Sequence, residues 1–406
     1  MWRWQCRSRE GEILKVKGSF LHDEPALRVS FGWDAHGNLV KDMDRAGLSR
    51  AVVVCGRSLA KSGSELELLR EALGPRLAGI HPGARPHSPV PQVIETSRFL
   101  RDAGADAIIA VGGGSAIVTA RAASILLAEG EDVAALATSV TAEGRMISPR
   151  LRAPKLPQFV IPTTPTTAIV KAGSAIYDEV AGKRRALFDP KTRSQAVYVH
   201  PALLAPVPKQ VFVSAGLNTL CMAVEGLIAT KGDPLADAQL THALRLAADG
   251  LAQLNGPEAG QARTDLIFAA ILCGRATDST NGGLTTALGH AIGVRHHVEN
   301  GIVNAVVLPS VLEFNADAAA GDLRKVERAL GLAAAGSARE SALVIGRHLV
   351  ELFDALGVPR TLGELGVPAE ARPALAQLVT EDWFLRGNPR PVGDATEVER
   401  VMTTLW

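Results

Sequence analysis

The sequence has only four cysteines among its 406 residues, and no two of them are spaced as a CxxC pair. This spacing argues against a disulfide framework and against a cysteine zinc site, so we expect reduced thiols buried in a core. The four cysteines are Cys6, Cys55, Cys221 and Cys273.

An excess of either charge is also absent, because the formal net charge is +1. The sequence therefore indicates neither a nucleic-acid surface nor an acidic tail. No run of about 18 uninterrupted apolar residues is present, and no apolar segment of signal-peptide length follows the charged start at Arg7, Arg9 and Glu10. We expect a cytoplasmic protein that binds a small molecule and contacts neither nucleic acid nor membrane.

The composition favours a folded chain, because 47% of the residues are hydrophobic and 21% are charged. The length predicts two domains. Neither an internal repeat nor a low-complexity tract is present.

The first half alternates between two kinds of segment. Short apolar runs at 51–55, 107–111 and 158–161 are typical of parallel strands buried on both faces. Helical periodicity lies between them, at 93–103 and 116–130. This alternation predicts a doubly wound α/β domain with a parallel sheet.

The second half is rich in Ala and Leu at helical spacing and has few β-branched runs. The clearest predicted helices are 244–254, 266–276, 323–332 and 341–356. An all-helical second domain follows. We place the boundary between residues 180 and 181, so that the domains are 1–180 and 181–406.

Three glycines and a serine follow the apolar run at 107–111. Gly112, Gly113 and Gly114 allow a sharp turn and a close approach of the backbone to a phosphate, and the following helix offers free N–H groups. Ser115 is expected to cap that helix or to bind the phosphate. The alternative is a plain strand-to-helix turn that needs glycine.

A threonine-rich segment follows the apolar run at 158–161. Hydroxyl groups at the end of a strand can bind a ribose or a phosphate, which makes Thr163, Thr164 and Thr167 candidate cofactor residues. A polar turn whose threonines bond to local backbone groups is an equal alternative.

These elements, in this order, resemble the iron-containing alcohol dehydrogenase superfamily, in particular its maleylacetate reductase branch. The resemblance covers nearly the whole chain. It implies an N-terminal α/β nucleotide-binding domain, a helical C-terminal domain of the dehydroquinate synthase-like kind, and an active-site cleft between them. It also implies a homodimer. The matching segments are Phe31-Gly32, 111–115, 162–164, 214–218, 223–225, 288–293, 304–309 and, for the reductase branch, 388–391.

The resemblance also locates the family's metal ligands, which are often one Asp and three His. The corresponding positions here are Asn218, Met222, Thr286 and Asn300. Amide, thioether and hydroxyl groups are poor ligands for Fe(II) or Zn(II), so we expect no metal and assign these four residues to a substrate pocket.

Other departures concern the cofactor. Asp34 replaces a family glycine, and a carboxylate there would repel a pyrophosphate. Arg121 replaces a lysine that follows the glycine loop, and Val118 replaces an Asp, as in the reductase branch. Because the glycine loop is retained, NAD(P)H remains the expected cofactor, and Gly56 followed by Arg57 would tolerate NADPH.

Three further residues are candidates for the chemistry. His290 matches a family histidine beside the nicotinamide and is the expected proton donor; a buried structural histidine is the alternative. Lys183 matches a lysine near the cofactor, although a solvated basic hairpin explains it as well. His297 would enter the pocket or belong to a solvated turn with His296 and Arg295.

These observations leave three hypotheses for function. The first is a metal-independent NAD(P)H-dependent reductase of an unsaturated or keto acid. The second is a redox-neutral biosynthetic enzyme, such as a cyclase, dehydratase or lyase, on the same fold. The third is a non-catalytic binding protein. For a dicarboxylate such as maleylacetate, candidate arginines are Arg295, Arg386 and Arg390.

Overall fold

The computed structural model describes residues 20–61, 65–141 and 146–406. Cys55, Cys221 and Cys273 are free and buried, as expected. Cys6 and the charged residues at the start of the chain lie outside the described residues.

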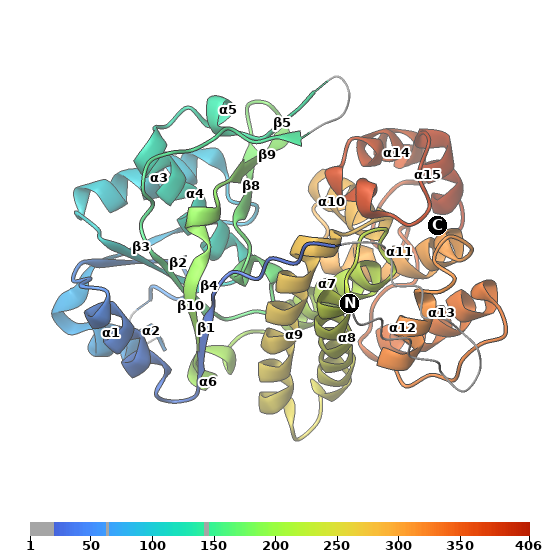
Figure 1. Ribbon diagram of the computed structural model, residues 1–406, viewed down its shortest axis with the longest axis horizontal. Coiled ribbons are helices and arrows are strands. Elements are labelled where there is room, and N and C mark those ends of the chain that lie inside the picture. The colour runs from blue at the N-terminus through green and yellow to red at the C-terminus, as the bar shows by residue number, and fades with distance from the viewer. Residues whose placement is uncertain (1–19, 62–64, 142–145) are drawn as a thin grey trace, which may run out of the picture.

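A six-stranded sheet forms the first part of the molecule (Figure 1). Its strand order is β1-β10-β7-β4-β2-β3, and every neighbouring pair is parallel. The three strands expected from the apolar runs, β2, β4 and β7, lie side by side in it. The strands are β1 (Arg28–Phe31), β2 (Ala51–Gly56), β3 (Leu77–Ala84), β4 (Ala107–Gly112), β7 (Gln158–Pro162) and β10 (Ser194–Val199).

Helices cover both faces of this sheet. Successive side chains along a strand point to opposite faces, so a single strand packs with helices on both sides. In β2, Val53 and Cys55 pack with α1 (Ala35–Arg45) and α2 (Leu66–Leu73). Val52 and Val54 belong to the core that contains α3 (Val90–Asp102) and α4 (Gly114–Glu129). The doubly wound α/β arrangement is therefore confirmed.

A two-stranded antiparallel hairpin, β8 (Gly173–Asp178) and β9 (Lys183–Phe188), lies outside the sheet. It is anchored to the α/β part by the backbone N–H of Tyr177, which donates to the Ser88 carbonyl at 3.2 Å, and by that of Thr138, which donates to the Ala186 carbonyl at 2.7 Å. The smaller elements of this part are η1 (Gly74–Arg76), α5 (Val133–Leu136), β5 (Ser139–Val140), β6 (Met146–Ile147), η2 (Thr167–Ile169) and η3 (Pro190–Thr192).

The domain boundary lies further along the chain than expected. Residues 180 and 181 fall in the turn that joins β8 to β9, and β10 then returns to the sheet between β1 and β7. The α/β part therefore extends to Val199. The sequence prediction placed the boundary too early because the basic hairpin does not have the apolar pattern of the buried strands.

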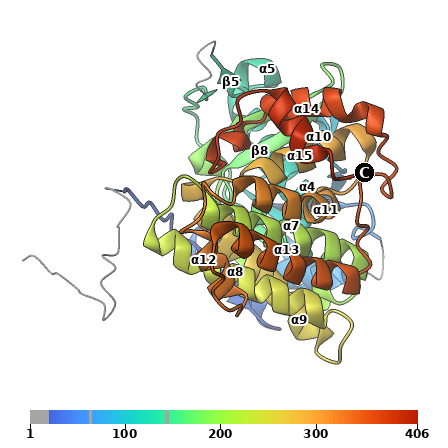
Figure 2. The same cartoon turned by 90° about the vertical axis from the view of Figure 1, so that its right-hand side faces the viewer.

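Helices make up the second part, as Figures 1 and 2 show, and the C-terminus lies in this part. The predicted helices at 244–254, 266–276, 323–332 and 341–356 correspond to α8, α9, α12 and α13. The elements are α6 (Pro201–Leu204), α7 (Lys209–Ile228), α8 (Pro234–Gln253), α9 (Ala259–Thr280), α10 (Leu284–His296), α11 (Asn300–Asn315), α12 (Leu323–Ala329), α13 (Ala338–Ala355), η4 (Ala369–Ala371), α14 (Arg372–Thr380), η5 (Trp383–Gly387) and α15 (Ala395–Met402).

Helix α7 is the central helix of this part. By length and composition alone it could cross a membrane, but 78% of its most apolar window is buried inside the protein. It packs against α8, α9 and α11. We therefore interpret α7 as a core helix.

Candidate active site

The glycine loop and the threonine segment lie side by side at the carboxyl ends of β4 and β7. Gly112 has a φ of +141°, which favours glycine. The Thr163 N–H donates to the Gly112 carbonyl at 3.0 Å. A Cβ on Gly113 would lie 2.7 Å from the Thr164 hydroxyl oxygen, so this residue must be small to let the two loops meet.

Helix α4 begins directly after this turn and has Gly113 as its N-cap. Ser115 lies in the first turn and is not the cap, contrary to one of the expected roles. Its carbonyl accepts a hydrogen bond from the Ser88 hydroxyl at 3.2 Å. The first N–H groups of α4 have no acceptor within the helix, and they lie beside two buried threonines. This arrangement is suited to a phosphate group.

Thr167 links this loop to the helical part. Its hydroxyl lies 3.9 Å from the sulfur of Met222 in α7, and a Cβ on Gly274 of α9 would lie 2.8 Å from its carbonyl oxygen. The expected cofactor residues and the expected substrate pocket therefore meet at Thr167 and Met222.

Arg121 does not extend the cofactor site. Its side chain is fully buried, and its guanidinium donates to the carbonyls of Gly173 at 2.8 Å and Ala168 at 2.6 Å. Burial lowers its pKa to about 9. Arg121 therefore holds the segment between β7 and β8 in place instead of binding a phosphate.

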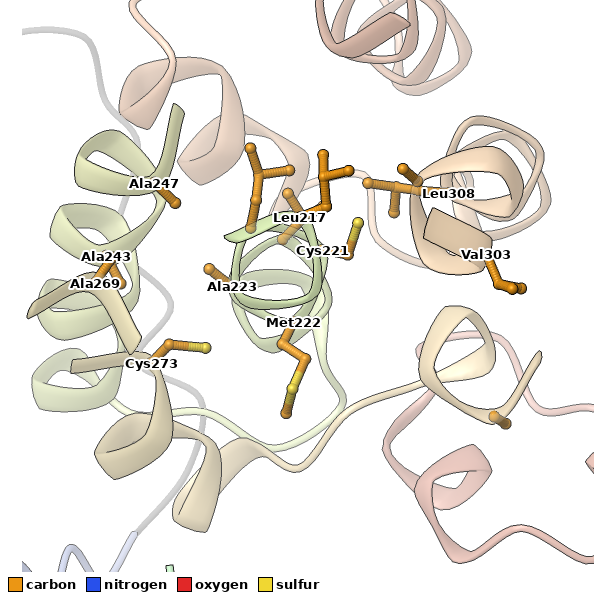
Figure 3. Close-up of a cluster of buried hydrophobic side chains, with 14 of the residues drawn as sticks. Leu217, Cys221, Met222, Ala223, Ala243, Ala247, Ala269, Cys273, Val303 and Leu308 are labelled. Carbon is orange, nitrogen blue, oxygen red and sulfur yellow. The ribbon is translucent and has the colours of Figure 1, made fainter. Parts of the chain in front are cut away.

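The four positions that correspond to the family's metal ligands lie on α7, α10 and α11. In Figure 3, Met222 extends from α7 on the side away from Leu217. The Asn218 amide lies 3.6 Å from the Met222 sulfur and bonds to the Asn304 amide at 3.0 Å. Asn300 lies over Gly293, where an added Cβ would come within 2.1 Å of its amide oxygen.

Thr286, an expected pocket residue, also contacts a buried carboxylate. Its hydroxyl donates to Glu225 at 2.6 Å, and the same carboxylate accepts the N–H groups of Thr285 at 2.6 Å and Thr286 at 3.1 Å. Glu225 therefore binds the N-terminal end of α10. The Thr286 hydroxyl is engaged in this structural contact.

These residues do not fit the metal of the family. The side chains of Asn218, Met222 and Thr286 are neutral amide, thioether and hydroxyl groups, which bind Fe(II) and Zn(II) weakly. Among residues 20–61, 65–141 and 146–406, no three His, Cys, Asp or Glu side chains are grouped so that they could hold a metal ion.

His290 forms a pair with Asp382, which sequence reasoning missed. His290 Nδ1 lies 2.8 Å from an Asp382 carboxylate oxygen. The other carboxylate oxygen accepts the Phe384 N–H at 2.9 Å, which begins the short helix η5. The Phe384 ring contacts the imidazole edge to face at 5.3 Å. His290 is therefore fixed in orientation by a carboxylate, not by a backbone partner.

The ionic state of Asp382 supports this pairing. Burial alone raises the pKa of Asp382, but the hydrogen bond to His290 and the charge of Arg184 outweigh burial and lower it below 3.8. Asp382 is therefore a carboxylate at neutral pH. Its oxygen contacts Nδ1 of His290 and leaves Nε2 for other contacts.

An open cleft of about 560 Å³ lies between the β8–β9 hairpin and α10. His290, Lys183 and His297 all line it, so the structure brings the three expected residues together. Lys183 and His297 are exposed, whereas His290 is half-buried. The cleft is also lined by Tyr177, Gly182, Arg184, Ala291, Val294, Arg295, Leu378, Glu381, Asp382 and Trp383.

Sequence reasoning also missed Arg184. Residues that alternate along a strand point to opposite faces, and Arg185 pairs with Asp178 at 2.9 Å while Arg184 lines the cleft. The alternation of side chains along this basic strand could have predicted that Arg184 and Arg185 face opposite sides. Asp382 had no such signal, because its partner lies in a distant helix.

Two of the three candidate arginines are not among the residues that line this cleft. Arg390 stacks over Phe314, 4.2 Å from its ring centre, and pairs with Glu397 at 3.3 Å. Neither Arg386 nor Arg390 is among the residues that line the cleft, whereas Arg295 is. Asn388, in the motif that resembles the reductase branch, forms two amide hydrogen bonds with Asn315 at 2.8 and 3.0 Å. That motif therefore has a structural role.

Comparisons with known proteins agree with this arrangement. Residues 25–201 match the model of iron-containing alcohol dehydrogenase, and residues 212–405 match that of the C-terminal part of the Fe-containing alcohol dehydrogenase family. The chain is 29% identical to lactaldehyde reductase from Escherichia coli K12 over 93% of its length and 97% of that protein's.

A second curated relative supports the family, and a solved structure has the same fold. The chain is 31% identical to maleylacetate reductase 2 from Cupriavidus pinatubonensis, over 77% of its own length and 78% of that protein's. The solved structure of an alcohol dehydrogenase from Oenococcus oeni has a TM-score of 0.87 at 22% identity and covers 95% of this chain and 100% of that one. The chain belongs to the iron-containing alcohol dehydrogenase family of oxidoreductases.

Proposed function

We propose that this chain is an NAD(P)H-dependent reductase of an unsaturated or keto acid that works without a metal ion. The observation that carries the proposal is the His290–Asp382 pair, 2.8 Å apart, in a cleft with cationic side chains. The similarity to maleylacetate reductase 2 supports the same class of substrate.

The cofactor half of the site is the loop of Gly112 to Ser115 with the adjoining Thr163 and Thr164. The close approach of Gly113 to Thr164 places N–H and hydroxyl donors together, as a pyrophosphate requires. Thr167 lies between this loop and Met222. Bound NAD(P)H would supply a hydride to the substrate.

The protein's own contribution is the proton and the positioning. His290, protonated on both nitrogens, donates the Nε2 proton to the carbonyl oxygen, or to the alkene carbon next to the one that receives the hydride, and is then reprotonated from water. Asp382 keeps the imidazole in place. Asn218, Met222 and Thr286 are poor ligands for a Lewis-acidic metal ion. In this proposal the carbonyl is therefore polarised by a hydrogen bond from His290.

A cofactor titration followed by turnover tests this function. Protein dialysed against a chelator is titrated with NADH and NADPH by fluorescence, and then given keto acids and unsaturated diacids. We expect micromolar binding of one cofactor and its oxidation with at least one acid. Failure to bind millimolar cofactor would refute the reductase. Tight binding without oxidation across the panel would favour the redox-neutral alternative.

A further inference from the structure

The cleft contains a second group of side chains whose chemistry the hydride and proton steps do not use. Arg184 lines the cleft from the β8–β9 hairpin, and His297 lines it from the C-cap of α10. His87, in the loop between β3 and α3, lies within electrostatic range of both, and its pKa is lowered first by burial and then by these two neighbours. The hairpin, the end of α10 and the loop between β3 and α3 therefore each bring one basic side chain to this region.

Arg184 has no direct partner of its own. Its neighbour Arg185 pairs with Asp178 at 2.9 Å. In the described part of the chain, the Arg184 side chain has no hydrogen bond or ion pair, and it interacts with Asp382 only as a more distant charge. Burial lowers the pKa of Arg184, and the charge of Asp382 opposes this change. A half-buried guanidinium without a partner is suited to an incoming anion.

The backbone near this group is held in a costly conformation. Four described residues other than glycine have a positive φ, and three of them are His87 at 62°, Ser88 at 50° and His297 at 55°. Such backbone strain tends to gather at binding sites. It persists here because Ser88 is held by bonds to Ser115, Thr119 and Tyr177.

Those bonds relate the basic group to the cofactor loop. Ser88 bonds to the first turn of α4, where the phosphate groups of a cofactor would lie, and to β8 of the hairpin that carries Arg184. His290 and Asp382 line the same cleft as Arg184. A substrate carbon placed near His290 therefore has an unpartnered cation within the same cleft.

We propose that Arg184, assisted by His87 and His297, binds a carboxylate of the substrate and orients its reacting carbon toward His290. Glu381 and Asp382 carry the opposing negative charge of the cleft, so the carboxylate binds on the hairpin side. That this carboxylate belongs to a substrate rests on the proposed function. The anion site itself is testable without turnover.

Succinate, a redox-inert dicarboxylate, is a probe that needs no catalysis. It is titrated into the wild-type protein and into R184Q and R185Q, by calorimetry and by tryptophan fluorescence with W383F as the spectroscopic control. R185Q is the matched control, because it removes the same charge one residue away on the face that binds Asp178. We expect about 10- to 100-fold weaker binding in R184Q and less than about 3-fold change in R185Q.

Turnover and cofactor binding complete the test. With a keto acid and its neutral methyl ester, R184Q should lose kcat/KM for the acid but not for the ester, while the Kd for NADPH stays unchanged. Equal losses in R184Q and R185Q, or equal losses for acid and ester, would overturn the proposal. A weaker Kd for NADPH with unchanged succinate binding would instead assign Arg184 to a cofactor phosphate. If the wild-type protein binds succinate but never oxidises a cofactor, only the proposed function fails.

Discussion

The Thr286 hydroxyl donates a hydrogen bond to the Glu225 carboxylate at 2.6 Å, which joins α10 to the last turn of α7. Glu225 is buried and accepts two further bonds from the first backbone N–H groups of α10. A carboxylate at the N-terminal end of a helix is also favoured by the helix dipole. One side chain thus fixes the start of the helix that carries His290.

We expect Glu225→Ala to destabilise the protein by about 2–4 kcal/mol, because it leaves the Thr286 hydroxyl and two N–H groups without acceptors. Urea unfolding measures the change. Val224→Ala, on the same helix, is the control for packing loss alone, with an expected cost of about 1–2 kcal/mol. Equal costs would mean that the bonds contribute little.

Glu225 also predicts a dependence of stability on pH. Burial raises its pKa above the ordinary 4.5, although the bonds from Thr286 and Thr285 oppose that change. The folded state therefore binds this proton more tightly than the unfolded chain, so the contribution is complete below pH 4.5 and falls as pH rises through the folded pKa. We expect unfolding free energies of wild type and Glu225→Gln, measured between about pH 5 and 8, to differ in slope. Parallel curves would contradict this.

The donor set of Asn218, Met222, Thr286 and Asn300 predicts independence from metal ions. Dialysis against a chelator, or addition of Fe(II) or Zn(II), should leave both activity and Tm unchanged. Elemental analysis by mass spectrometry and thermal melting provide the measurements. A stoichiometric metal in the purified protein would show that other groups complete a site.

The His290–Asp382 pair predicts two graded effects on turnover. His290→Gln removes the proton donor and should lower kcat by about 10²–10⁴-fold. Asp382→Asn keeps the shape but removes the charge that orients the imidazole, so a smaller loss is expected. NADPH binding in each variant serves as the control for folding. Full activity in His290→Gln would assign the proton transfer to another group.

The contact between Gly113 and Thr164 predicts that adding one methyl group at residue 113 lowers stability. Gly113→Ala would place Cβ 2.7 Å from the Thr164 hydroxyl oxygen, so we expect a loss of about 1–3 kcal/mol in stability and weaker cofactor binding. Adding Thr164→Ala to that variant removes the clash and should restore the Tm. If the double variant stays as unstable as the single one, the two loops are not in contact.

The sequence predicted those elements whose signal is local. The strands β2, β4 and β7 are buried on both faces and have continuous apolar runs, so their place in the sheet was predictable. Strand β1 is a partly exposed edge strand without such a run. The boundary at 180 was wrong for a related reason, because the basic hairpin precedes the last strand of the sheet.

The candidate site followed the same rule. His290 was found through a motif, but Asp382 is 92 residues away, and only the packing of η5 against α10 brings them together. The resemblance to the family singled out Thr286 as a pocket residue. It did not reveal that its hydroxyl is taken by Glu225, a contact that depends on how two helices cross.

The hairpin that carries Arg184 is anchored to the α/β part through Tyr177 and Thr138, whereas His290 and Asp382 belong to the helical part. A rotation of one part against the other therefore changes the separation between Arg184 and His290. A molecule bound to both Arg184 and His290 would hold the two parts at one separation. A ligand too short to reach both residues would leave that separation free to vary. Selection for substrate length would then depend on the separation of the two parts, as well as on the shape of the cleft.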